Sequence, residues 1–112
     1  MPKTNARPYA RMTIEALALL ADAIKVARRE KGMRTQELAE RACISRGLLQ
    51  RIEQGDAGCS IGAVFEVAAI LGVPLFHADK DILALHHGHL RQRLALLPKD
   101  VRKKRITLDD NF

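Results

Sequence analysis

The sequence is poor in aromatic residues: it has no tryptophan, and aromatics make up 4% of its 112 residues. A core formed by this chain must therefore be aliphatic, built from Leu, Ile, Val and Ala. Runs of β-branched residues are nearly absent too, whereas helix-forming residues dominate. These shortages argue against a sheet protein and predict an all-α fold, in one small domain with tails.

Cysteine is also scarce, and Cys43 and Cys59 lack the CxxC spacing of a zinc or redox site. Two metal ligands on one helix face usually stand at i and i+4, a spacing that the histidines lack, so neither a metal nor a cofactor is expected. No apolar run approaches the roughly 20 residues that span a bilayer, and no signal peptide is visible. We therefore expect a cytoplasmic protein with reduced thiols and no membrane partner.

Positive charge is concentrated at the two ends of the chain, which carries a net charge of +6. Residues 1–12 contain three basic residues and no acidic one, and residues 98–112 have a net charge of +2. Residues 13–76 hold eight basic and eight acidic residues and are neutral. Basic ends attract phosphate, so nucleic acid is the favoured partner; charged tails that aid solubility are the alternative.

Apolar spacing and capping residues divide the chain into a basic N-terminal arm (1–12), a helical domain (13–78), a C-terminal helix (79–97) and a tail of basic and acidic residues (98–112). Thr13, Ser45, Ser60 and Asp79 are the expected N-caps. They predict helices over 14–31, 46–54, 61–71 and 80–97, with a further helix over 36–42 and a short fifth element over 73–76. Ile14 and Ile61 are expected to face the core.

The segment from Thr35 to Gly55, TQELAERACISRGLLQRIEQG, is the most informative part of the chain. It predicts two short helices joined by a tight turn. This spacing is typical of a helix-turn-helix, in which the second helix enters the DNA major groove.

From Leu20 to Leu75 the chain resembles the Xre/Cro-type helix-turn-helix family, the five-helix fold of lambda-repressor-like phage repressors. Four segments in order carry the resemblance: AIKVARREKGM, QELAERA, ISRGLLQRIEQG and SIGAVFEVAAILGVPL. It implies a nucleoid-associated transcriptional repressor that binds double-stranded operator DNA. The complete expectation is this five-helix domain followed by an additional C-terminal helix and a basic tail.

The resemblance assigns roles to particular residues. The helix over 46–54 would read bases, by bidentate bonds from arginine to guanine or from glutamine to adenine. Solvation or phosphate contact is the alternative for its arginines. Helix N-termini attract anions, so phosphates would be held near the start of the helix over 36–42. The base-reading candidates are Arg46, Gly47, Gln50 and Arg51, and the phosphate candidates are Arg34, Thr35, Gln36, Ser45 and Gln54.

A structural ion pair between Arg28 and Glu53 is also implied by the resemblance. The sequence departs from the family pattern in three places. Arg34-Thr35 stands where Ser-Gln is usual, so Thr35 becomes a candidate cap. Cys43 occupies a turn position often filled by glycine, and it would be strained there if φ is positive. Gly47 gives a reading position no side chain.

The two C-terminal parts suggest protein partners. A leucine stripe at Leu83, Leu90, Leu94 and Leu97 predicts that the helix over 80–97 forms a homodimer; packing back on the first helix is the alternative. The C-terminal end of the chain contains Leu96-Leu97-Pro98-Lys99, the basic run Arg102–Arg105 and the ending Leu108-Asp109-Asp110-Asn111-Phe112. These segments resemble the tails of HipB-like antitoxins, which restrain a HipA-like kinase toxin. Phe112 is a candidate anchor for such a partner, and a frayed, soluble tail is the alternative.

Three other functions remain to be weighed. A stand-alone repressor without a toxin partner is the first, and a protein-interaction module that no longer reads DNA is the second. An enzyme is the third and is not expected, because no nucleophile–base pair, phosphate loop or carboxylate pair stands out.

Overall fold

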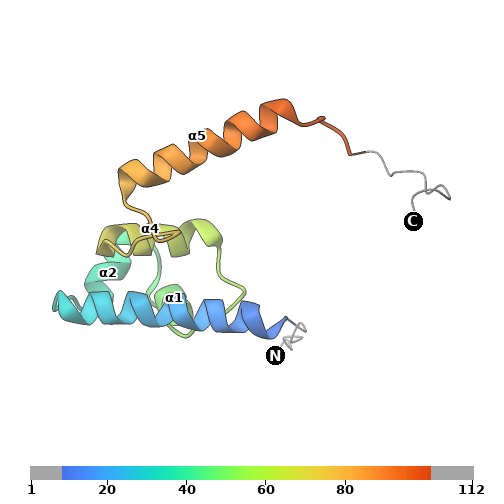
Figure 1. The fold of residues 1–112 in the computed structure, drawn as a ribbon. Coiled ribbons are helices and arrows are strands. Elements are labelled where there is room, and N and C mark those ends of the chain that lie inside the picture. Colours follow the sequence, from blue (N-terminus) through green and yellow to red (C-terminus); the bar gives the residue numbers. More distant parts are fainter. Residues whose placement is uncertain (1–8, 102–112) are drawn as a thin grey trace. The chain divides into compact units, whose positions relative to one another are not determined.

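The computed structural model describes residues 9–101 and contains five helices in that range (Figure 1). They are α1 (Arg11–Glu30), α2 (Thr35–Ala42), α3 (Arg46–Glu53), α4 (Ile61–Leu71) and α5 (Lys80–Leu96). The all-α prediction is confirmed. The chain divides after His77 into two compact units, one holding α1–α4 and the other α5.

The first unit is built around an aliphatic core to which all four of its helices contribute. Ile24 of α1, Leu38 of α2, Leu49 of α3 and Val67 of α4 are each fully buried. Met33, in the link between α1 and α2, closes the core at one end. Because α3 packs against both α1 and α2, its orientation is fixed by apolar burial on two sides.

Helix α1 begins at Arg11, which corrects the prediction that Thr13 is its cap. The N-cap is Ala10, whose side chain makes no capping bond. Exposed N–H groups of a first turn are satisfied by water, so the helix does not need to begin at a hydroxyl residue. The prediction that Ile14 and Ile61 face the core is wrong. Both lie in the first turn of their helix, α1 and α4, and they are 57% and 70% exposed.

Three predicted caps are confirmed by hydrogen bonds. Ser45 accepts from the Leu48 N–H, Ser60 from the Ala63 N–H, and Asp79 from the Ile82 N–H. The chain after α4 differs from the prediction, because residues 73–76 do not form a helix. Phe76 and His77 both have positive φ, so the chain makes a tight turn there instead.

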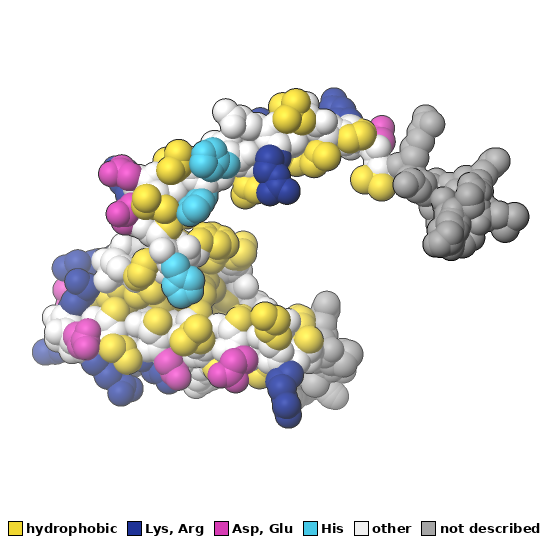
Figure 2. Space-filling view, in the orientation of Figure 1, with side chains coloured by type: hydrophobic (Ala, Val, Ile, Leu, Met, Phe, Trp, Pro, Cys, Tyr) yellow, Lys and Arg dark blue, Asp and Glu magenta, His cyan; other side chains and the backbone are white. Residues whose placement is uncertain are grey.

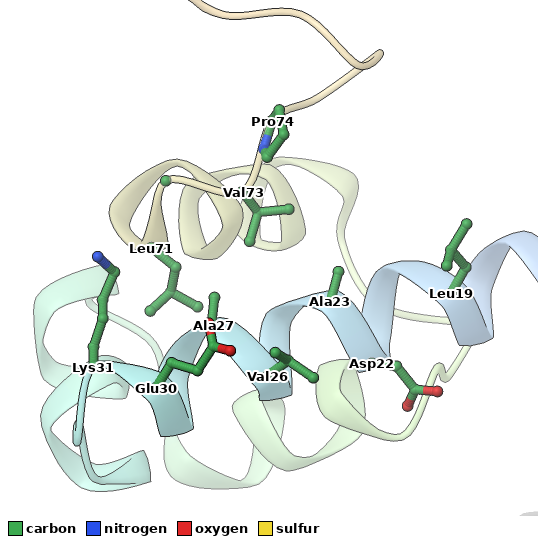
Figure 3. A pocket seen from close by; sticks show the side chains of 11 residues that line it. Leu19, Asp22, Ala23, Val26, Ala27, Glu30, Lys31, Leu71, Val73 and Pro74 are labelled. Atoms are coloured by element: carbon green, nitrogen blue, oxygen red, sulfur yellow. The ribbon is translucent and has the colours of Figure 1, made fainter.

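A hollow of about 680 Å³ lies between α1 and the end of α4 (Figure 3). Leu19, Ala23 and Val26 of α1 line one side, and Val73 and Pro74 line the other. No residue of α2 or α3 lines it, so the hollow is separate from the helix-turn-helix.

Helix α5 forms the second unit, and none of its residues is buried. Apolar side chains are exposed along its length (Figure 2). No helix within residues 9–101 combines the length and the apolar character required to cross a membrane.

Candidate nucleic-acid interface

The turn between α2 and α3 is held by a left-handed residue. Cys43 ends α2 with a φ of 57°, in the region where glycine is usual. The next N–H, that of Ile44, donates to the Ala39 carbonyl at 3.0 Å. Ile44 then packs against the core, and Ser45 caps α3. The two helices therefore meet in a hydrogen-bonded turn whose central residue carries backbone strain.

Helix α3 has one buried face and one exposed face. Leu49, Ile52 and Glu53 face inward. The four base-reading candidates lie on the remaining surface, and all are exposed: Arg46, Gly47, Gln50 and Arg51. Leu48 is half-buried at the edge of this surface. Helix α3 is eight residues long, and its exposed side carries polar side chains. A helix of this kind fits into the DNA major groove, which is wide enough to admit an α-helix.

Glu53 is the buried charged residue of α3, and its partner is Arg28 of α1. Arg28 Nε donates to Glu53 Oε2 at 2.7 Å, and Arg28 Nη2 donates to Glu53 Oε1 at 3.1 Å. Arg28 Nη1 also donates to the Met33 carbonyl at 3.0 Å. The arginine therefore links α1, the following turn and the buried side of α3.

Arg51 has a charged partner on the loop that follows α3. Its Nε donates to Asp56 Oδ2 at 2.9 Å, although both side chains are well exposed. The Arg51 guanidinium, and then the Gly58 N–H, hold the pKa of the Asp56 carboxyl below its ordinary value. Burial raises the pKa of the nearby Cys59 thiol above its ordinary value.

The start of α2 carries three of the phosphate candidates. Its N-cap is Arg34, whose side chain makes no capping bond, so Thr35 is the first helical residue and not the cap. The leading N–H groups of α2 therefore have no side-chain acceptor and can bind an anion. The Gln36 amide donates to Glu40 Oε2 at 2.8 Å, so its side chain is already engaged.

The other phosphate candidates lie at the two ends of α3. Ser45 Oγ accepts from the Leu48 N–H at 3.0 Å, which leaves its hydroxyl hydrogen for a phosphate. Gln54 is exposed at the C-cap. The phosphate candidates thus lie at the start of α2 and at the two ends of α3, within the helix-turn-helix.

The candidates for protein partners lie elsewhere. The leucine stripe of the second unit is exposed, at 36% for Leu83 and between 53% and 59% for Leu90, Leu94 and Leu97. Phe112 and the basic run 102–105 lie outside the described residues, as do Lys3 and Arg7 of the arm. No group of three or more histidine, cysteine or acidic residues within 9–101 is arranged to hold a metal ion.

Asp56 and Gly58 are site residues that the sequence prediction did not include. The available signal was an acidic residue shortly after Gly55, five positions beyond Arg51. That spacing exceeds the i+4 reach of a helical pair, so only the path of the loop brings the two side chains together.

Residues 19–79 match a family model described as a helix-turn-helix domain. The match covers more than half of the chain. The chain belongs to the helix-turn-helix domain family. A domain of this family identifies the protein as a DNA-binding regulator. No curated protein and no solved structure matches the chain.

Proposed function

We propose that this helix-turn-helix protein is a sequence-specific transcriptional repressor of the Xre/Cro type, in which α3 is the recognition helix. The observation that carries the proposal is that α3 has one buried face and one exposed face. Its apolar residues and Glu53 are buried, whereas Arg46, Gly47, Gln50 and Arg51 are exposed. Polar outer faces are common on surface helices, but arginine and glutamine on the second helix of a helix-turn-helix are the side chains that form bidentate bonds to guanine and adenine.

The proposed roles follow from the chemistry of these side chains. Arg46 and Arg51 carry donors that match guanine O6 and N7, and Gln50 matches adenine N6 and N7. Gly47 allows the backbone of α3 to approach the bases closely, because it has no Cβ. No step of the proposal requires catalysis.

Phosphate contacts would set the register of α3 in the groove. The uncapped N–H groups at the start of α2 supply one anchor, with Arg34 adding positive charge. Ser45 and Gln54 supply anchors at the two ends of α3. These contacts bind every sequence alike and determine how deeply the recognition helix enters.

The proposal extends to a homodimer formed through α5. A single α3 reads few base pairs, and repressors of this kind reach useful specificity by binding two half-sites about 34–36 Å apart. Helix α5 is suited to this role because its leucine stripe is exposed and none of its residues is buried. A change of Leu90 to lysine is expected to give a monomer in sedimentation experiments while α1–α4 stay folded.

A footprint on the DNA upstream of the protein's own gene tests the proposal. We expect two protected half-sites about one helical turn apart. We also expect an affinity that falls steeply with salt, because binding releases counterions from the phosphates. A protein that bound no segment of this DNA, or bound all segments equally, would instead be an interaction module.

An antitoxin role is the narrower form of the proposal. It rests on the resemblance of the tail to HipB-like proteins, and the candidate anchor Phe112 lies outside the described residues. Co-expression with a kinase gene beside it in the genome tests this form. An antitoxin is expected to co-purify with the kinase and to lose it when residues 108–112 are deleted, whereas a stand-alone repressor would show no such partner.

A further inference from the structure

The loop after α3 holds the guanidinium of Arg51 through an anchored carboxylate. Asp56 Oδ2 accepts from Arg51 Nε at 2.9 Å, and Asp56 Oδ1 accepts from the Gly58 N–H at 2.7 Å. The Asp56 N–H in turn donates to the Arg51 carbonyl at 3.1 Å. Both oxygens and the main chain of Asp56 are therefore engaged, so the position of its carboxylate does not depend on Arg51 alone.

Gly58 completes this arrangement by leaving room for the guanidinium. A Cβ at this position would lie 3.1 Å from Arg51 Nη2 and 3.3 Å from Asp56 Oδ1. Those distances are shorter than ordinary van der Waals contact. The loop after α3 thus lies close around the guanidinium of Arg51, and a larger residue at 58 would require the guanidinium or the Asp56 carboxylate to shift by a few tenths of an ångström.

Arg51 differs in this respect from Arg46, whose side chain makes no hydrogen bond within residues 9–101. The bond to Asp56 uses Nε, whereas Nη1 and Nη2 of Arg51 make no hydrogen bond within the same range. Two nitrogens of one guanidinium are the donors that guanine O6 and N7 accept. Gly47 precedes Arg51 by one helical turn, so no side chain from that position covers them.

We propose that Asp56 is a positioning residue that fixes the guanidinium of Arg51 to read one guanine, and that the Arg51–Asp56 pair sets the base preference of α3 at that one position. This inference rests on the proposed function, because it assumes that α3 enters the major groove. Two physical effects support it. A guanidinium held by the folded protein loses less rotamer freedom on binding. The neighbouring carboxylate also repels phosphate, so the pair favours a neutral base edge over the backbone.

The opposite role for Asp56 makes the opposite prediction. If Asp56 only neutralised Arg51 and kept it from the DNA, its removal would release an arginine for new contacts. Base discrimination at one position would then increase. The direction of change therefore separates the two roles.

The test measures the affinity of the full chain for its footprinted operator and for every single-base variant of it. The wild type is expected to prefer guanine at one position by about 5- to 150-fold, the range of a bidentate contact. Arg51→Ala should abolish that preference. Asp56→Asn should reduce it to less than about threefold, while affinity for the operator variants that lack this guanine rises or stays level because a negative charge near the DNA is lost.

Two further variants provide controls. Glu37→Gln removes one acidic charge from another exposed ion pair, that of Glu37 with Arg41 on α2. It should change affinity for all sequences alike and leave the base preference intact. Gly58→Ala keeps every charge but crowds the guanidinium, which must shift by a few tenths of an ångström. It should weaken the same guanine preference, by less than Asp56→Asn does.

Each outcome has a definite meaning. A preference that survives Asp56→Asn, or that grows in that variant, overturns the positioning role while leaving the repressor function intact. A preference unaffected by Arg51→Ala also overturns the inference, since another residue then reads that base. A wild-type protein that binds no operator overturns the proposed function and, with it, this inference.

Discussion

Arg28 Nε lies 2.7 Å from Glu53 Oε2, and the pair joins α1 to the buried side of α3. Both side chains are about nine-tenths buried, at 11% and 10% exposure. A buried pair of this kind has a large desolvation cost, so its loss matters most when only one partner is removed. The position of α3 depends on this pair as well as on Leu49 and Ile52.

The first prediction concerns Glu53→Ala. It leaves the Arg28 guanidinium buried without its carboxylate, and we expect a loss of about 3–5 kcal/mol in the free energy of unfolding. Thermal and urea unfolding followed by circular dichroism measure it. The double variant Arg28→Met, Glu53→Leu should lose less, because no charge is stranded. A double variant less stable than Glu53→Ala would contradict this explanation.

The second prediction concerns the strained turn at Cys43, which ends α2 with a φ of 57°. Glycine adopts this conformation without steric cost, so Cys43→Gly should stabilise the domain by about 1 kcal/mol. The melting temperature should rise accordingly. Cys43→Ala is the matched control: alanine has the same Cβ and should leave stability nearly unchanged. Equal effects of the two changes would show that the thiol, and not φ, matters.

The third prediction separates stability from DNA binding at Gly47. Its φ is ordinary for a helix, and a Cβ there would meet nothing closer than Ser45 Oγ at 3.9 Å. Gly47→Ala should therefore stabilise α3 by about 0.5–1 kcal/mol. It should nevertheless weaken operator binding, because in the proposed binding mode the added methyl group would face the bases.

Gly62 provides the control for that experiment. It occupies the same second position of α4, and a Cβ there also lies 3.9 Å from its capping serine, Ser60. Gly62→Ala should give a similar gain in stability with unchanged DNA affinity. If Gly47→Ala bound the operator as well as Gly62→Ala does, close approach of α3 at Gly47 would be ruled out.

The fourth prediction concerns the pH dependence of the Arg51–Asp56 pair. The guanidinium of Arg51 and the Gly58 N–H lower the pKa of Asp56 in the folded state. A lowered pKa means that the contribution of the carboxylate to stability is present at neutral pH. It is lost as the pH falls through the folded-state pKa. In an NMR titration, Asp56 should titrate below an ordinary aspartate, and Arg51→Ala should raise its pKa. An unchanged pKa in that variant would mean that the pair does not form in solution.

The sequence predicted those helix boundaries that are set by local chemistry. Ser60 and Asp79 each cap a helix through a bond to an N–H three residues ahead, so α4 and the start of α5 lie where expected. The start of α1 was wrong because Ala10 caps it with no side-chain bond. A solvent-exposed helix end without such a bond has no sequence signal.

The candidate site was predictable only in part, for a similar reason. The outward position of Arg46 and Gln50 follows from helical periodicity, once Leu49 and Ile52 are recognised as core residues. The partner of Arg51 does not follow from periodicity. Asp56 reaches it because the chain turns back after Gly55, where φ is 76°, and the resulting loop has no repeating pattern to read.

The fifth prediction compares Arg46→Ala with Arg34→Ala. Each change removes one positive charge, the first from α3 and the second from the start of α2. Arg46 is proposed to read a base, so its loss should relax specificity at one operator position by about 1–3 kcal/mol. Arg34 is proposed to contact phosphate, so its loss should weaken binding to all sequences alike and reduce the salt slope by about 1.

Affinity of these two variants for the complete set of single-base operator variants, measured at several salt concentrations, is the most direct test of the claim that the exposed face of α3 reads DNA. The account predicts one relaxed position for Arg46→Ala and a uniform loss for Arg34→Ala. Wild-type affinity and an unchanged base profile in both variants would contradict it, and the DNA-binding surface would then lie elsewhere on the protein.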